Sequence, residues 1–281
     1  MSLDPVKNAL YCQGTFDVEN PTQQQMQVML ENAADIAASG FGTVLLGQWH
    51  VHPDGTIYYN DSPLDTVTEN VSVISAALKA TGSSVQKVLI SFGPFLTDFS
   101  AIQSNYASFT ATMGELYQTT AVDGFDWDIE AYSLQEYAPY ESLIVNLTQW
   151  ATGLGCLVTA APFNVQQFWQ QVIAQTNTPT QTGFAWWNLQ TYGGASYAQW
   201  VSYLAGLVAD PASFLVPGFT AEYASPTAVQ QQLASDAQSN PTLSGGFIWQ
   251  YEWILKSGYT VSQFASAVAN GVGGVPTAVA R

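Results

Sequence analysis

The chain has 281 residues, of which 47% are hydrophobic and 13% aromatic, so it can bury a large core and is not intrinsically disordered. Only 9% of the residues are charged, and 21 acidic against 5 basic side chains give a formal net charge of −16. This charge repels phosphate groups, which excludes a general nucleic-acid binder and disfavours anionic lipid surfaces and phosphorylated substrates. No apolar run approaches the roughly 20 residues of a membrane helix. The remaining polar surface suits neutral polar ligands.

A repeated unit runs along the chain and consists of a short apolar strand, a polar loop and an amphipathic helix. In chain order, the expected strands are residues 8–13, 43–51, 87–92, 122–130, 156–163, 184–192, 214–220 and 245–251. The expected helices are residues 21–38, 67–80, 99–119, 134–152, 165–176, 197–208, 226–239 and 261–270. Pro21 at the start of the first helix and Gly40 after its end are typical helix boundaries.

Eight such units in a chain of this length predict a single closed (β/α)8 barrel over residues 6–270, followed by a C-terminal tail over residues 271–281. An open doubly wound sheet is the structural alternative. It usually carries a glycine-rich phosphate loop after its first strand, but that position reads CQGTF at residues 12–16. In a barrel, catalytic side chains are expected at the C-terminal ends of the strands.

The fourth expected strand carries carboxylates at alternate positions, Asp126, Asp128 and Glu130. Because side chains alternate across a strand, these three share one face, and the apolar residues between them take the other. In a barrel the acidic face points inward, with Glu130 uppermost at the mouth. Repulsion and desolvation should then keep at least one proton on the group near neutral pH, which is what a general acid needs.

Other interpretations of the acidic strand are a solvated acidic patch, a Mg²⁺ or Ca²⁺ site, and a barrel that binds a ligand without catalysis. The apolar residues between the carboxylates argue against a solvated patch. The chain also lacks the basic residues that usually accompany phosphate chemistry, so neither a metal nor a cofactor is predicted. His50 and His52 have a spacing that permits a metal pair on a strand, but no third ligand is evident.

Residues 123–130 read DGFDWDIE and resemble the DGxDxDxE signature of the glycoside hydrolase family 18 chitinases. Later segments are similar to the class III, hevamine-like branch of that family: VTAAP at 158–162, WWNLQTY at 186–192 and GGFIW at 245–249. The third strand departs from the family, because SFGP stands at 91–94 where the family has Ser-x-Gly-Gly. Pro94 lacks a backbone N–H and fixes φ, which alters the expected loop geometry and substrate fit.

The resemblance implies retaining hydrolysis of β-1,4-linked N-acetylglucosamine polymers or oligomers, with the 2-acetamido group of the substrate as the nucleophile. It implies that Glu130 protonates the leaving oxygen and then activates water. Asp128 would orient the acetamido group, and Asp126 would tune the pKa of Asp128. Tyr192 would be a fourth catalytic residue, with its hydroxyl on the acetamido carbonyl.

The resemblance also supplies candidates for substrate binding. Gln190 would hold the reacting sugar and Trp249 would form an apolar floor under it, and Asp123 and Ser91 are added from the matching motifs. Further aromatic residues at loop starts could stack on an extended sugar chain: Phe16, Trp49, Tyr132, Phe163 and Tyr223. For the aromatic residues, Gln190 and Tyr192, core packing is the alternative.

The predicted partner is therefore a carbohydrate, chitin or a chito-oligosaccharide, and we expect a monomer without membrane contact. An endo-β-N-acetylglucosaminidase acting on N-glycan cores is the alternative enzyme, and a non-catalytic chito-oligosaccharide-binding barrel is the alternative of another class. Binding barrels of this kind typically lose the last acid, whereas Glu130 is present. Residues 1–5 lack the pattern of a signal peptide, so an extracellular protein would require a removed leader, and a cytoplasmic location stays open. Cys12 and Cys156 are expected to be buried thiols.

Overall fold

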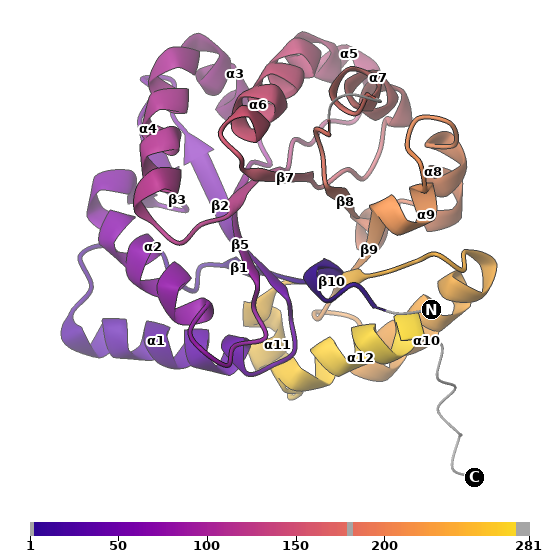
Figure 1. Ribbon diagram of the computed structural model, residues 1–281. Coiled ribbons are helices and arrows are strands. Elements are labelled where there is room, and N and C mark those ends of the chain that lie inside the picture. The colour runs from indigo at the N-terminus through magenta and orange to yellow at the C-terminus, as the bar shows by residue number, and fades with distance from the viewer. Residues whose placement is uncertain (1–2, 179–181, 274–281) are drawn as a thin grey trace.

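Eight parallel strands close into a barrel, and helices surround it (Figure 1). The structure is a computed structural model and describes residues 3–178 and 182–273. Around the barrel the strands lie in the order β1, β2, β5, β6, β7, β8, β9 and β10, and β1 pairs with both β2 and β10, which closes the sheet. The predicted (β/α)8 barrel is confirmed.

The barrel strands are β1 (Asn8–Gln13), β2 (Thr43–Val51), β5 (Lys87–Phe92), β6 (Gly124–Trp127), β7 (Leu157–Ala160), β8 (Trp186–Leu189), β9 (Leu215–Thr220) and β10 (Gly246–Trp249). An antiparallel hairpin of β3 (Ile57–Tyr59) and β4 (Ser62–Pro63) extends β2.

The α-helices are α1 (Gln23–Ala37), α2 (Leu64–Leu78), α3 (Leu96–Ser104), α4 (Tyr106–Thr119), α5 (Leu134–Tyr137), α6 (Glu141–Gly153), α7 (Gln166–Thr176), α8 (Tyr197–Tyr203), α9 (Pro211–Phe214), α10 (Pro226–Ser239), α11 (Tyr251–Ser257) and α12 (Val261–Gly273). Short 3-10 turns are η1 (Pro5–Lys7), η2 (Ala138–Tyr140) and η3 (Thr191–Gly193). None of the helices within residues 3–178 and 182–273 is long and apolar enough to cross a membrane.

Local sequence signals account for several helix ends. Thr22 and Gln25 form a capping box at the start of α1, because each side chain accepts a hydrogen bond from the backbone of the other. Ser225 caps α10 through the backbone N–H of Ala228, with Pro226 as the first helical residue. Gly258 ends α11 in the left-handed conformation, where a glycine meets no steric cost.

The first three barrel strands have the predicted bounds, but other elements differ. The predicted helix 99–119 is two helices, because Asn105 has a non-helical backbone and its side-chain amide donates to the carbonyl of Ala101 at 2.9 Å. The predicted strand 245–251 ends at Trp249 and is followed by α11. The predicted tail begins too early, because α12 extends to Gly273 and buries Gly271 and Val272; residues 274–281 lie outside the described residues.

The alternation of side chains along the strands divides the apolar residues into two cores. On β1, Ala9 and Tyr11 point into the barrel, while Leu10 and Cys12 pack under the helices. The inner core contains seven buried side chains: Ala9, Tyr11, Leu45, Leu89, Trp186, Val216 and Phe247. The barrel is therefore a packed body, and a ligand can reach only its ends.

At the C-terminal end of β6 the backbone continues alongside the exit of β5. The N–H of Asp128 donates to the carbonyl of Phe92 at 2.9 Å, and the N–H of Glu130 donates to the carbonyl of Pro94 at 3.1 Å. Pro94 therefore contributes an acceptor, for which it needs no N–H. Gly93, between the two acceptors, has φ of +134°, and a Cβ there would lie 1.9 Å from the carbonyl oxygen of Asp128.

We predict that Gly93→Ala destabilises the fold by at least about 2 kcal/mol, because neither the positive φ nor the clash with the Asp128 backbone can be relieved cheaply. Denaturant unfolding measures this change. Gly153→Ala is the matched control, because a Cβ at Gly153 meets nothing within 4 Å and the residue lies in α6. Equal stability of the two variants would contradict the predicted close approach.

Candidate active site

Asp126 lies on β6 inside the barrel and accepts four side-chain hydrogen bonds. Tyr11 and Ser91 donate to Oδ2 at 3.0 and 2.8 Å, and Thr159 and Asn188 donate to Oδ1 at 2.5 and 3.3 Å. Its side chain is fully buried, and this burial raises the pKa of Asp126 even though the four hydrogen bonds act in the opposite direction. Asp126 is thus a buried carboxyl with a complete set of donors.

Asp128 and Glu130 follow β6 and stand one above the other toward the mouth. The predicted strand 122–130 is shorter, because β6 ends at Trp127, yet the predicted alternation continues: Asp128 is 4% exposed, and Ile129 packs in the outer core. The carboxyl groups of Asp128 and Glu130 are both held by the amide nitrogen of Gln190, at 2.9 and 2.8 Å, so the two acids lie next to each other. Burial raises the pKa of both, and the charges of Glu130 and Asp126 raise that of Asp128 further, well above its usual range.

Two glutamine amides hold this carboxyl pair. Gln48 donates to Asp128 Oδ2 at 2.9 Å. Gln190 places its Nε2 2.9 Å from Asp128 Oδ1, 2.8 Å from Glu130 Oε1 and 2.9 Å from the carbonyl of Ala161. The nitrogen of Gln190, predicted to hold a sugar, is therefore engaged with the carboxyls. Its Oε1 has no hydrogen-bond partner among the described residues and is the atom left for a ligand.

Tyr192 and Trp249 form an aromatic wall beside the carboxyls. Their rings stack with centroids 6.4 Å apart and an interplanar angle of 20°, and Trp249 also contacts Tyr11 at 5.2 Å. The ring of Tyr192 is 36% exposed, whereas its hydroxyl is buried near Asp128, Glu130 and Asp126, and burial followed by these charges raises its pKa well above the usual range. The hydroxyl has no hydrogen-bond partner among the described residues. Tyr192 is thus placed to donate to a ligand above Asp128.

Four residues of the polar network were not among the predicted site residues: Tyr11, Gln48, Thr159 and Asn188. Tyr11, Thr159 and Asn188 have the inward parity of their strands, and that parity was the available signal. Gln48 had no such signal. The register of β2 against β5 shifts between Leu46 and Trp49, and this irregularity exchanges the inward and outward positions, so that Gln48 turns inward and Trp49 packs in the outer core.

Three residues predicted to bind substrate do not face the mouth of the barrel. Ser91 is fully buried below Asp128 and donates to Asp126, so it positions that carboxyl and cannot reach a ligand. Asp123 lies at the opposite, N-terminal end of β6, where it pairs with Lys79 at 2.8 Å and Lys87 at 3.3 Å. Phe16 is 1% exposed and packs in the outer core, and the next residue, Asp17, is tied to the hairpin because its carbonyl accepts from the hydroxyl of Ser62 at 2.5 Å.

The other aromatic candidates separate by exposure. Trp49 is fully buried and stacks on Tyr59 at 5.0 Å. Tyr132 and Tyr223 are 82% and 81% exposed, on the loops after β6 and β9, and Tyr132 contacts Phe163 edge-on at 5.7 Å. Two prominent tyrosines therefore stand on loops at the end of the barrel where Glu130 lies.

The two histidines do not converge. His50 Nδ1 lies 3.0 Å from Asp98 Oδ2, while His52 stacks on Tyr58 with centroids 4.0 Å apart. Within the described ranges, no three His, Cys, Asp or Glu side chains are grouped so that they could hold a metal ion.

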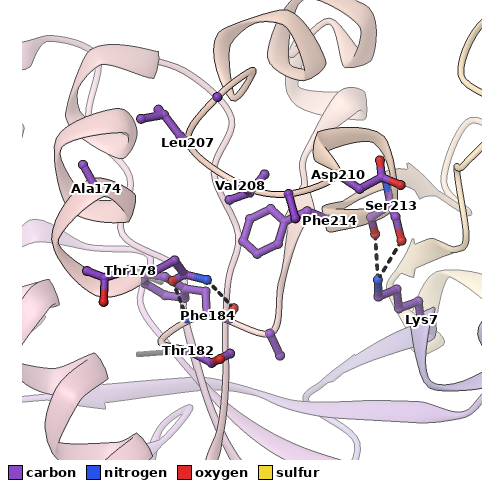
Figure 2. Close-up of a pocket in the computed structure, with 14 residues that line it drawn as sticks. Lys7, Ala174, Thr178, Thr182, Phe184, Leu207, Val208, Asp210, Ser213 and Phe214 are labelled. Carbon is purple, nitrogen blue, oxygen red and sulfur yellow. Dashed lines mark hydrogen bonds between the residues drawn. The ribbon is translucent and has the colours of Figure 1, made fainter. Parts of the chain in front are cut away.

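One cavity of about 600 Å³ lies between α8, α10 and the C-terminal part of β9. Tyr192 is in its wall, but none of the three carboxyls lines it. Another of about 770 Å³ lies at the N-terminal end, between Phe184, Phe214 and Lys7, whose Nζ donates to the carbonyl of Ser213 at 2.7 Å (Figure 2). This second cavity lies away from Glu130, which follows the C-terminal end of β6.

No protein-family model and no curated protein matches the sequence. Solved structures do match the fold. A GH18 chitinase from Pseudoalteromonas aurantia is 16% identical with a TM-score of 0.63, covering 94% of this chain and 99% of that chain. The catalytic domain of a GH18 chitinase from the fern Peteris ryukyuensis is also 16% identical, with a TM-score of 0.63, and the match covers 94% of this chain and 98% of that chain. The Group IV chitinase of Ostrinia furnacalis, in complex with allosamidin, is 13% identical with a TM-score of 0.63, and the match covers 92% of this chain and 96% of that chain. At these identities the likeness establishes a shared fold.

A further acid lies at the start of α11, next to β1. One oxygen of Glu252 accepts from the N–H of Gln13 at 3.4 Å, and the other is buried without a partner among the described residues. The hydroxyls of Thr15 and Tyr59 are likewise buried and unpartnered. Burial, with a contribution from the charge of Asp17, raises the pKa of Glu252 to about 7.

Glu252 should therefore make stability fall as pH rises. Its pKa is above the ordinary value of 4.5, so its favourable protonated state is fully populated below about pH 4.5 and is lost as pH rises through about 7. We predict that Glu252→Gln raises the free energy of unfolding at pH 8 by up to about 3 kcal/mol and changes it little at pH 4. Glu136→Gln, at an exposed carboxylate that accepts from Ser133, is the control and should give no gain at pH 8. A gain for Glu252→Gln that is the same at both pH values would contradict the assigned titration.

Proposed function

We propose that the chain is a family 18 glycoside hydrolase that cleaves β-1,4-linked N-acetylglucosamine polymers or oligomers. One observation carries this proposal: a carboxyl pair, Asp128 and Glu130, is held by Gln190 at the C-terminal mouth of a barrel whose fold is that of GH18 chitinases. A proton held at that position is the requirement for a general acid. The allosamidin complex of the Ostrinia furnacalis chitinase supports a carbohydrate ligand.

In this proposal Glu130 is the proton donor and acceptor. It is the most exposed of the three acids, and burial raises its pKa, so it is suited to donate a proton while it still reaches a substrate at the mouth. It gives that proton to the leaving glycosidic oxygen and then takes one from the attacking water. Gln190 fixes its Oε1 throughout and thereby sets the direction of the proton transfer.

Asp128 would support the nucleophile, which is the 2-acetamido oxygen of the substrate itself. As the acetamido group closes onto the anomeric carbon, positive charge develops beside Asp128, and an ionised carboxylate there stabilises it. Asp126 already accepts four donors and can carry charge while Asp128 is protonated. The pair can therefore exchange which member is ionised as the reaction proceeds.

The aromatic wall would position the reacting sugar. Trp249 offers an apolar surface for the C–H face of the ring, and the buried hydroxyl of Tyr192 would donate to the acetamido carbonyl. Gln190 Oε1 can accept from a sugar hydroxyl. The retaining outcome follows from the participation of the acetamido group. Its oxygen displaces the leaving glycosidic oxygen at the anomeric carbon, water then displaces the acetamido oxygen, and the two inversions restore the configuration.

The preference for chitin over N-glycan cores is part of the proposal and rests on the hevamine-like segments at 158–162 and 186–192. A product profile on chitohexaose beside a high-mannose glycopeptide separates the two substrate classes. The monomeric state and the extracellular location stay predictions.

Glu130→Gln is expected to lower the rate of chitohexaose hydrolysis at least about 100-fold, because it removes the transferable proton while it keeps the shape and the contact with Gln190. Binding of chitohexaose, measured by calorimetry, should persist. Glu136→Gln, six residues further along and exposed, is the matched control and should keep full activity. Undiminished hydrolysis by Glu130→Gln would remove Glu130 from the acid role.

Substrates without a 2-acetamido group are expected to be inert, because no other nucleophile is assigned. We expect the de-N-acetylated oligomer and plain β-1,4-glucose oligomers to react at least about 100-fold more slowly than the acetylated oligomer of the same length. Release of reducing ends is the measurement. Comparable cleavage of glucose oligomers would contradict the participation of the acetamido group.

A further inference from the structure

Gln48 on β2 is a hydrogen-bond donor committed to Asp128. Its Nε2 lies 2.9 Å from Asp128 Oδ2, and this is its sole acceptor among the described residues. The nitrogen of Gln190, by contrast, is shared between both carboxyls and a backbone carbonyl. Asp128 therefore has one oxygen on a shared donor and the other on a donor of its own.

The contact with Asp128 decides how the Gln48 amide lies. The side chain is 2% exposed, and its Oε1 is buried without a hydrogen-bond partner among the described residues. A buried acceptor without a partner is unfavourable, so the placement of the nitrogen is the gain that offsets it. Because the side chain is shielded in this way, Gln48 acts on the reaction through Asp128.

The turn of the β3–β4 hairpin fixes both backbone polar groups of Gln48. Its N–H donates to Asn60 Oδ1 at 2.9 Å, and its carbonyl accepts from the N–H of Asn60 at 2.7 Å. Asn60 has φ of +49°, a conformation that asparagine adopts more readily than most residues with a Cβ. These bonds lie where the register of β2 against β5 shifts, between Leu46 and Trp49. One turn residue thus holds Gln48 at the irregularity that points it inward.

The residues that follow Gln48 and precede Asn60 pack against each other. Trp49 and Tyr59 are both fully buried, are paired across β2 and β3, and stack with ring centroids 5.0 Å apart. Aromatic packing therefore holds the hairpin turn beside β2, in addition to the hydrogen bonds of Asn60.

Asp128 depends on neutral donors because its charged neighbours oppose its ionisation. Burial, followed by the charges of Glu130 and Asp126, raises the pKa of Asp128, and the hydrogen bond from Gln48 lowers it. Among the described residues, the titratable groups that act on Asp128 are acids and phenols: Asp126, Glu130, Tyr11, Tyr137 and Tyr192. No cation is among them, so amide donors take the place of a positive charge.

We propose that Gln48 is a positioning residue of the reaction, which holds Asp128 in the orientation that the acetamido group requires, and that Asn60 holds Gln48 in turn. The proposal rests on the proposed function for the step in which Asp128 acts. It makes the β3–β4 hairpin part of the support of the reaction site, although the hairpin supplies none of the three acids. Loss of this support weakens a contact of the transition state and leaves ground-state binding nearly unchanged.

Gln48→Met removes the amide and keeps the length of the side chain. For chitohexaose, kcat should fall at least about tenfold while KM changes less than about twofold, because the role of Asp128 lies in the transition state. The acidic limb of the kcat profile should move to higher pH, because Asp128 loses a hydrogen bond that lowers its pKa. Gln86→Met, at an exposed glutamine just before β5, is the matched control and should change none of these values. An unchanged kcat and pH profile in Gln48→Met would overturn the role of Gln48.

A second variant covers the case in which Gln48→Met does not fold. Gln48→Asn keeps an amide at the buried position but is one methylene shorter, so it withdraws the donor from Asp128. It should lower kcat and move the acidic limb in the same directions, and wild-type values would overturn the role of Gln48.

Asn60→Gly tests the hairpin, because glycine keeps the positive φ and removes the acceptor for the N–H of Gln48. We expect kcat to fall at least about threefold, and the double variant with Gln48→Met to be no more than about twofold slower than Gln48→Met alone, because both changes act through one contact. Asn20→Gly, at an exposed asparagine with φ of +38°, is the control and should keep full activity. Losses that multiply in the double variant would overturn the link between Asn60 and Gln48.

A titration followed by NMR separates this inference from the proposed function. The carboxyl carbon of Asp128, assigned by its absence in Asp128→Asn, should titrate at higher pH in Gln48→Met than in the wild type, with no such change in Gln86→Met. Failure of the wild type to hydrolyse any oligomer would overturn the proposed function, while the displaced titration would still support the hold of Gln48 on Asp128. An unmoved titration in Gln48→Met would overturn that hold, whatever the wild type hydrolyses.

Discussion

The site depends on the burial of three carboxyl groups, Asp126 on β6 and Asp128 and Glu130 directly after it, which follow one another toward the mouth of the barrel. Burial in a packed barrel disfavours the ionised form of each, and their mutual repulsion adds to this for Asp128. Hydrogen bonds offset part of this cost. Four side chains donate to Asp126, and the amides of Gln48 and Gln190 donate to the pair that follows it. Burial still raises the pKa of all three carboxyls, which favours their protonated forms. A group that must keep a proton to be buried is also a group that can donate one.

Backbone hydrogen bonds also fix the position of the three acids. Asp128 and Glu130 lie beyond the end of β6, yet the exit of β5 accepts hydrogen bonds from both of their N–H groups. Gly93 lets the two backbones approach, and Pro94 fits because its carbonyl, not an N–H, is the group in use. The departure at Pro94 thus leaves the carboxyls supported. The irregularity in β2 completes the arrangement, because it turns the amide of Gln48 inward.

Charge and aromatic content then restrict what the mouth of the barrel can bind. The chain carries −16, and exposed tyrosines rather than cations stand near the site. Tyr192 and Trp249 stack on each other beside the carboxyls. The site therefore pairs ring faces with hydrogen-bonding groups, which is the chemistry that suits a neutral sugar.

The sequence alone determined the barrel and the inward column of acids, because a period of two along a strand and a repeat of strand and helix are local properties. It could not determine which polar side chains meet Asp126 and Asp128, since Tyr11, Gln48, Thr159 and Asn188 come from four other strands. Nor could it separate Phe16 and Asp123 from the site: burial and pairing with Lys79 and Lys87 depend on which segments lie opposite them. The high exposure of Tyr132 and Tyr223 likewise depends on which segments lie beside them in the folded chain. Exposure is decided by neighbours, and neighbours in a closed barrel are set by its tertiary structure.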